Sequence, residues 1–181
     1  MEGIELLKTR RSIRTFSGEE VSDSELRSII DAAAYAPSWK NTQTVSYIAV
    51  RNKDTLEKII NEGVMGHAGN KRNIGGCAVL VAVITQKGIC GYEADGKPTT
   101  SRGDKWETFD AGIATQTFCL AAHAYGVGSV IMGIYDEQKM AEILGIDNCK
   151  YAVSALIALG KHDGTAKAPK RKTCDELLTI I

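Results

Sequence analysis

The stretch Ala78-Val79-Leu80-Val81-Ala82-Val83-Ile84 is apolar at every position and contains several β-branched side chains. β-branched residues favour the pleated backbone of a strand, and an apolar run without alternation is typical of a strand that is covered on both faces. The run is too short to span a lipid bilayer. We therefore predict that residues 78–84 form the central strand of a sheet whose two faces are covered.

The segments around this strand predict helices and further strands. Ser22-Asp23-Ser24-Glu25 fits a capping box, and the apolar residues after it recur at helical spacing until Pro37. In a first short helix, we expect Ile4 and Leu7 to pack inward. The other predicted elements are helices at residues 2–9, 54–61, 106–125 and 137–144 and strands at residues 45–51, 130–132 and 152–159. Because no β-α-β unit carries a nucleotide fingerprint, the pattern favours an α+β layered sheet over a doubly wound sheet.

A glycine-rich segment, Gly126-Val127-Gly128-Ser129-Val130-Ile131, has only part of a dinucleotide-binding loop. Ile131 stands where the third glycine is required, and Gly133-Ile134-Tyr135 does not provide the Gly-Lys-Ser/Thr of a phosphate-binding P-loop. Both nucleotide sites are therefore excluded.

The predicted helix at residues 106–125 is apolar or small at nearly every turn and ends at Gly126. Such a helix is either the central core helix or part of a large subunit interface. Residues 86–105 before it are rich in Gly, Thr, Lys and Asp and lack periodicity, which predicts a surface excursion of the kind that often carries function.

Composition narrows the class of protein. The chain has 181 residues, a formal net charge of zero and a pI near 6.8. Its length favours a single domain over residues 1–181, and the absence of a general basic field excludes nucleic acid and anionic membranes as expected partners. The five cysteines form no regular framework and no signal segment is recognisable, so we expect reduced thiols and a cytoplasmic protein. The three histidines are isolated in the sequence, so no metal site is predicted.

The first candidate site is a basic cluster after the first helix, Arg10-Arg11-Ser12-Ile13-Arg14. Three guanidinium groups this close repel one another unless they are solvated or face an anion, and the planar fork of arginine suits phosphate. A solvated basic loop explains the cluster as well, because most short basic runs are solvated.

Three further segments carry polar side chains that can contact a flat heteroaromatic ring or a phosphate. Each also has an ordinary explanation as a turn, a loop or a solvated tail. No Ser/His/Asp or Cys/His arrangement is recognisable, so the chemistry is expected to come from a cofactor. The segments are Ala36-Pro37-Ser38-Trp39-Lys40-Asn41-Thr42-Gln43, Asn70-Lys71-Arg72-Asn73 and Ala168-Pro169-Lys170-Arg171-Lys172.

In this order, the segments resemble the FMN-dependent nitroreductase family over essentially the whole chain. The stretch from Arg10 to Phe16 is similar to the opening R-x-S-x-R/K-x-F signature of the family, and Ala36 to Gln43 is similar to its A-P-S-x-x-N-x-Q segment. Trp106 to Ser129 resembles the long central helix that ends in G-L-G-S. Gly160 with Pro169-Lys170-Arg171-Lys172 resembles the closing G-x(n)-P-x-R-K segment.

The resemblance implies a nitroreductase-like layered fold: a central mixed β-sheet flanked by helices, a long central interface helix and a C-terminal arm exchanged in a homodimer. It implies two FMN sites, each made by both subunits. No side chain is expected to be catalytic, because flavin N5 carries the chemistry.

The resemblance also implies roles for individual residues. Arg10, Ser12 and Arg171 would grip the FMN phosphate beside Arg11 and Lys170 or Lys172, and Arg14 would approach the ribityl chain and the N1–C2=O side of the ring. Pro37, Ser38 and Trp39 of the partner would border the isoalloxazine, with Asn41 and Gln43 anchoring their loop. Asn70 would bond the pyrimidine edge, near Asn73, and the backbone of Met132 and Gly133 would face N5.

The function that the resemblance implies is a ping-pong hydride transfer from NADH or NADPH through FMN to an electron-poor small molecule such as a nitroaromatic or a quinone. Three alternatives stay open. They are a flavin dehydrogenase or dehalogenase that acts on a specific metabolite, a non-catalytic flavin-binding redox sensor, and an anion-binding protein without flavin.

Overall fold

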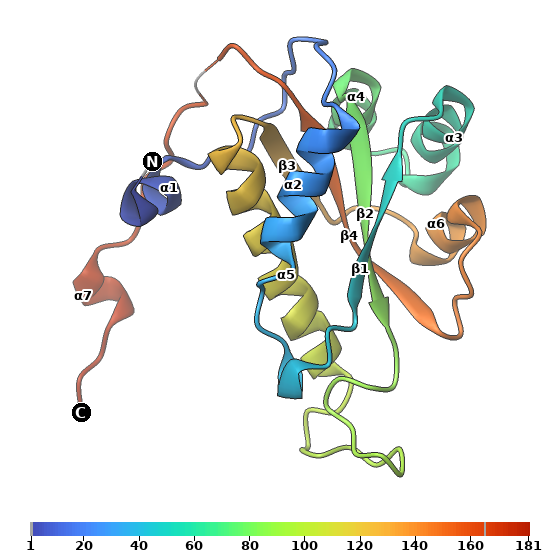
Figure 1. Cartoon of the computed structure of the whole chain (residues 1–181), viewed down its shortest axis with the longest axis vertical. Helices are drawn as coiled ribbons and strands as arrows, with labels where there is room; N and C mark the ends of the chain where they lie inside the picture. Colours follow the sequence, from blue (N-terminus) through green and yellow to red (C-terminus); the bar gives the residue numbers. More distant parts are fainter. Residues whose placement is uncertain (1, 165) are drawn as a thin grey trace.

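The computed structural model describes residues 2–164 and 166–181 (Figure 1). Its strands form one sheet in the order β1-β2-β4-β3. The bounds are β1 (Val45–Val50), β2 (Val79–Gln86), β3 (Gly128–Met132) and β4 (Tyr151–Gly160). The predicted central strand is confirmed, because β2 pairs with β1 on one side and with β4 on the other.

Strand β2 sends alternate side chains into two apolar cores. Val81 and Val83 belong to the core under one helical layer, whereas Leu80 and Ala82 belong to the core under the other. All four are fully buried, and full burial of a Val or Leu side chain contributes about 1.5–3 kcal/mol. The strand has no polar face because neither of its faces meets solvent.

Helices lie on both faces of this sheet (Figure 1). Helices α2 and α5 cover one face, and α3, α4 and α6 lie against the other. The bounds of the helical elements are α1 (Gly3–Thr9), α2 (Asp23–Ala33), η1 (Trp39–Asn41), α3 (Lys53–Lys58), η2 (Ile59–Gly63), α4 (Ala68–Gly76), α5 (Lys105–Ala124), α6 (Glu137–Leu144) and α7 (Cys174–Leu177). The predicted α+β layered architecture is confirmed.

Within that architecture the four strands pair antiparallel. The mixed sheet expected above is therefore wrong for these strands. A parallel pairing is described outside them, in the isolated bridge between Ser12 and Ser129 at the outer edge of β3.

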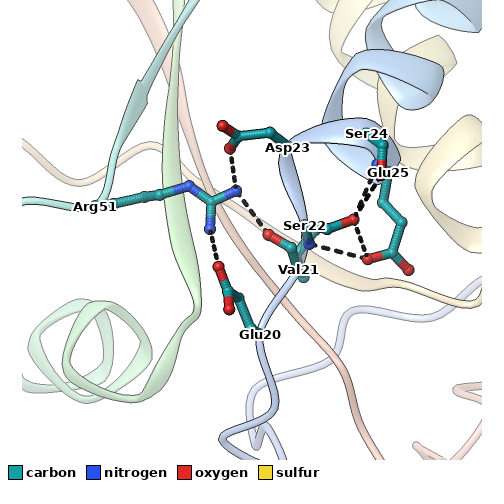
Figure 2. A network of polar contacts seen from close by, with 7 residues as sticks. All are labelled: Glu20, Val21, Ser22, Asp23, Ser24, Glu25 and Arg51. Atoms are coloured by element: carbon teal, nitrogen blue, oxygen red, sulfur yellow. Dashed lines mark hydrogen bonds and ion pairs between the residues drawn. The ribbon is translucent and has the colours of Figure 1, made fainter.

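The predicted capping box is confirmed at the start of α2. The backbone N–H of Glu25 donates to Ser22 Oγ at 3.2 Å, and the Ser22 N–H donates to Glu25 Oε2 at 2.9 Å. Arg51, which follows β1, donates to the Val21 carbonyl at 2.6 Å and to Asp23 at 3.1 Å, as Figure 2 shows. Lys161, which follows β4, forms an ion pair with Glu25. The start of α2 is thus bonded to the residues that follow β1 and β4, at one end of the sheet it covers.

One prediction about helices was wrong, and one helix was missed. Ile4 and Leu7 do not pack inward, since they are 64% and 57% exposed. Residues 70–73 lie within α4 and not in a loop, because His67 caps the helix by accepting a 3.1 Å hydrogen bond from the Asn70 N–H. The glycines in α4 disfavour a helix intrinsically, so burial of Ile74 and the cap must decide its formation.

Helix α5 is the predicted core helix, and its role in a subunit interface remains a prediction. Ala114, Phe118 and Ala122 are buried against the sheet, whereas Phe109 on the far side is 52% exposed. Residues 87–104, which lead into α5, form the predicted excursion at one end of the molecule (Figure 1).

The C-terminal segment leaves the body on the same side as α1 (Figure 1). Its apolar side chains are exposed, from Leu177 at 71% to Ile180 at 86%.

Candidate functional site

The basic segment after α1 runs along the free edge of β3. The Ile13 N–H donates to the Ser129 carbonyl at 2.9 Å, and the Ile13 side chain is buried. Since extended residues alternate in direction, Ser12 and Arg14 project the opposite way from Ile13. The close approach requires glycine on the sheet, because a Cβ on Gly128 would lie 3.0 Å from Ile13 Cβ.

Two adjoining pockets flank this segment. One, of about 340 Å³, is lined among others by Arg10, Arg11, Ser129, His123 and His162, and the other, of about 330 Å³, by Ser12 and Arg14. No carboxylate lines either pocket, and no described residue forms an ion pair with the three arginines. The charge that the segment presents is therefore positive and is not neutralised within the described chain, as an anion site requires.

His123 lies close to these positive charges, in the same pocket as Arg10 and Arg11. Burial, followed by the charges of Arg10, His162 and Arg11, lowers the pKa of His123. Its Nε2 lies 2.9 Å from Thr9 Oγ1, which connects the C-terminal part of α5 to α1. The sequence gives no signal for this contact, because His123 and His162 are separated from the arginines by most of the chain.

A second polar group lies at the end of β3. Asn70 is buried, and its Nδ2 donates to the Ile134 carbonyl at 2.8 Å. Asn73 is also buried, yet its Oδ1 has no hydrogen-bond partner among the described residues. Met132 contributes backbone only, since its side chain is buried, and no described atom lies within 4 Å of a Cβ built on Gly133. The structure thus brings Asn70 against the turn after β3, and the contacts of these residues with FMN remain predictions.

The segment from Pro37 to Gln43 forms a tight turn that contains η1. The Ser38 hydroxyl accepts a 3.0 Å hydrogen bond from the Gln43 N–H. Asn41 and Gln43 have φ of 56° and 49°, a left-handed conformation that is unfavourable for residues with a side chain. The turn is anchored to Asp110 near the start of α5, whereas the arginine pocket reaches His123 near its end. At 1.5 Å per residue these anchors are about 20 Å apart, so the turn and the basic segment lie at different ends of the helix.

The basic tail is not brought to the N-terminal cluster. Gly164 and Ala166 line the arginine pockets, but Lys170, Arg171 and Lys172 line neither. These three residues are exposed, and the hydrogen bond of Arg171 goes to the Pro169 carbonyl at 3.4 Å. Their phosphate contact remains a prediction.

Within residues 2–164 and 166–181, no group of three or more His, Cys, Asp or Glu side chains is arranged to hold a metal ion. None of the helices described is both long and apolar enough to cross a bilayer.

The family model described as "Nitroreductase family" matches residues 7–65 and 62–161. The chain belongs to the nitroreductase family. The matched ranges include the basic segment, the Pro37–Gln43 turn, α4 and all four strands.

Individual nitroreductase relatives agree with this assignment. The chain is 31% identical over 163 residues to an Archaeoglobus fulgidus protein named NADH dehydrogenase/NAD(P)H nitroreductase, covering 88% of this chain and 84% of the relative. It is 29% identical to an FMN reductase [NAD(P)H] of Bacillus subtilis, covering 93% and 70%. A nitroreductase from Desulfovibrio desulfuricans, solved in complex with FMN, is 24% identical and superimposes with a TM-score of 0.79 over 99% of this chain and 98% of that one. That likeness shows the nitroreductase fold.

Proposed function

We propose that this nitroreductase-family protein is an FMN-dependent NAD(P)H oxidoreductase that acts as a homodimer in the cytoplasm. The observation that carries the proposal is the arrangement of polar residues along the edge of β3. Beside its start lies a basic segment that has no carboxylate partner among the described residues, and the buried Asn70 contacts the turn that follows it. The FMN-bound relative and the FMN reductase support the choice of ligand.

The residues present fit FMN. Unpaired guanidinium groups at Arg10 and Arg14 suit the phosphate and the electron-rich edge of the ring. Asn70 holds the turn after β3 in place, and we propose that it and Asn73, one helical turn further along α4, lie near the pyrimidine edge of the ring. Open space beside Gly133 lets a flat ring approach the backbone. Arg11, Ser12 and Arg171, with Lys170 and Lys172, complete the proposed phosphate site.

A second copy of the chain supplies the rest of the site in this proposal. The turn that holds Pro37, Ser38 and Trp39 lies at the other end of α5 from the arginine pocket, so a partner chain is the source we propose for the residues that border the ring. Exposed apolar side chains on α1, α5 and the C-terminal arm offer the surface for that partner. An exchanged arm would cover Leu177 and Ile180.

When bound, FMN supplies hydride acceptance at N5 and returns reducing equivalents to a second substrate. The residues of the two chains bind and orient FMN. The arginines stabilise its negative charge, and the turn of the partner chain that holds Trp39 covers the ring. We propose a ping-pong order in which NAD(P)H leaves before an electron-poor acceptor such as a nitroaromatic or a quinone enters.

The absorption spectrum of the purified protein tests this proposal. We expect the visible flavin bands, release of FMN on denaturation, and oxidation of NADH or NADPH in the presence of a quinone. A protein that stays colourless after incubation with FMN would contradict the proposal. Arg10→Ala should lower FMN content, whereas Arg27→Ala, at a residue of α2 outside both arginine pockets, should not.

A further inference from the structure

Asp110 is a buried carboxylate on the core side of α5. It is 3% exposed, and its Oδ2 accepts hydrogen bonds from the backbone N–H of Trp39 at 2.8 Å and from the thiol of Cys90 at 3.1 Å. Burial of a carboxylate is unfavourable unless donors replace water. The thiol is a weak donor and stays protonated, because burial and then the neighbouring Asp110 raise the pKa of Cys90 to about 12. The Trp39 N–H is therefore the stronger of the two contacts.

The turn that Asp110 holds is strained. Lys40, Asn41 and Gln43 all have φ between 44° and 56°, in the left-handed region. Non-glycine residues remain in this region only where the surroundings fix them. The fixing contacts are the bond from Trp39 to Asp110 at the start of the turn and the bond from Gln43 to Ser38 across it.

The same turn is joined to the excursion at residues 87–104. Lys40 Nζ lies 3.1 Å from Glu93 Oε1, and the Trp39 ring packs against that of Trp106 with centroids 4.7 Å apart and the planes tilted by 43°. Trp106 in turn donates to Thr100 Oγ1 at 2.8 Å. Asp110 contacts both segments, because it accepts hydrogen bonds from Trp39 of the turn and from Cys90 of the excursion.

We infer that Asp110 is a positioning residue for the flavin-bordering turn: its carboxylate holds the backbone of Trp39 and thereby keeps the strained Pro37–Gln43 turn in the shape that borders FMN. This inference rests on the proposed function. Asp110 acts through Trp39 and contacts neither the flavin nor the acceptor.

Variants at Asp110 test the inference. Asp110→Ala removes the acceptor, whereas Asp110→Asn keeps an oxygen that can accept from Trp39. The matched control is Glu107→Ala, which removes another α5 carboxylate that accepts a backbone N–H, that of Gly88 at 2.6 Å, outside the turn. The readouts are the FMN dissociation constant from flavin fluorescence, the tryptophan emission of the apoprotein, and kcat and KM with a quinone.

The expected pattern separates positioning from general stability. Loss of one hydrogen bond to a charged group should raise the FMN dissociation constant of Asp110→Ala about tenfold and raise the quinone KM more than it lowers kcat. Asp110→Asn should stay within about threefold of the wild type. Tryptophan emission should shift in the alanine variant only, and Glu107→Ala should bind FMN as the wild type does. Wild-type FMN binding and tryptophan emission in Asp110→Ala would overturn the inference.

A second pair of variants covers the case in which Asp110→Ala does not fold. Trp39→Ala keeps the backbone N–H, and Trp39→Pro removes it, at a position preceded by the extended Ser38 that a proline accepts. We expect weaker FMN binding in the proline variant than in the alanine variant, and equal binding would overturn the inference. If the wild type binds no FMN, the proposed function fails by itself. The tryptophan emission of Asp110→Ala and Asp110→Asn then decides the positioning role without flavin.

Discussion

The side-chain amide nitrogen of Asn70 lies 2.8 Å from the carbonyl oxygen of Ile134, a bond that ties α4 to the turn after β3. Asn73, one helical turn further along α4, is just as buried, but its Oδ1 is unpaired among the described residues. The amide of the first asparagine has a hydrogen-bond partner within the chain, whereas the oxygen of the second is buried without a described donor. This difference between two neighbouring amides leads to the first prediction.

Asn73→Leu should stabilise the apoprotein and weaken FMN binding. An unsatisfied buried oxygen costs about 1–3 kcal/mol, and leucine also has the higher helix propensity. Urea denaturation of the apoprotein and FMN titration measure the two effects. Asn70→Leu is the control, and it should lower the free energy of unfolding because it removes a formed bond. Equal destabilisation by both variants would contradict the prediction.

Gly128→Ala should destabilise the protein by about 1–3 kcal/mol, the usual cost of overpacking. The new Cβ would lie 2.7 Å from His162 Cδ2 and 3.0 Å from Ile13 Cβ, so the His162 ring and the basic segment must shift. Gly133→Ala is the matched control, since its Cβ meets no described atom within 4 Å. Urea midpoints compare the two, and similar midpoints would show that the segment is not packed as described.

Acid should weaken the anchorage of α2. The hydrogen bond from Lys161, followed by those from Ser22, lowers the pKa of Glu25 from 4.5 to about 2. Because the folded state favours ionised Glu25, this stabilisation is complete above pH 4.5 and is lost as the pH falls toward 2. Urea midpoints at about pH 6 and about pH 3 should therefore differ less in Glu25→Gln than in the wild type. Glu19→Gln, a change to an exposed carboxylate, should keep the wild-type difference, and salt should reduce the effect.

Leu7→Lys should convert the proposed dimer into a monomer. Leu7 is 57% exposed in the isolated chain, and a charge in a buried interface is strongly unfavourable. Sedimentation measures the mass, and flavin absorbance measures FMN content, which should fall together with dimer formation. Met65→Lys is the control, because Met65 is 68% exposed near η2, on the other helical layer. A wild type that sediments as a monomer with bound FMN would contradict the shared site.

Features that depend on neighbours in the sequence were predicted correctly. The apolar run at residues 78–84, the Ser22 capping box and the helix that Gly145 ends at φ 68° are all present. The pattern of apolar residues in a strand, the capping residues of a helix and a left-handed glycine at its end each involve only a few neighbouring residues. They can therefore be recognised in the sequence.

Features that depend on distant contacts were missed. Ile4 and Leu7 have helical spacing, but they are exposed and do not pack against a core. Residues 70–73 are helical although their segment has a weak helix propensity. Periodicity indicates that an apolar face exists, but it does not say whether the chain itself or another molecule covers that face.

The sequence by itself determined the layered α+β architecture and the presence of a basic segment suited to an anion, because these follow from local patterning and charge. Only the tertiary structure decided the surroundings of that segment: the edge of β3, the pair His123 and His162, and the separation from the Trp39 turn. It also placed Asp110 against that turn, as one of two carboxylates on α5 that the sequence could not distinguish. The physical reason is that the effect of a charge is set by burial and by its hydrogen-bond donors, and here those donors come from segments far apart in the chain.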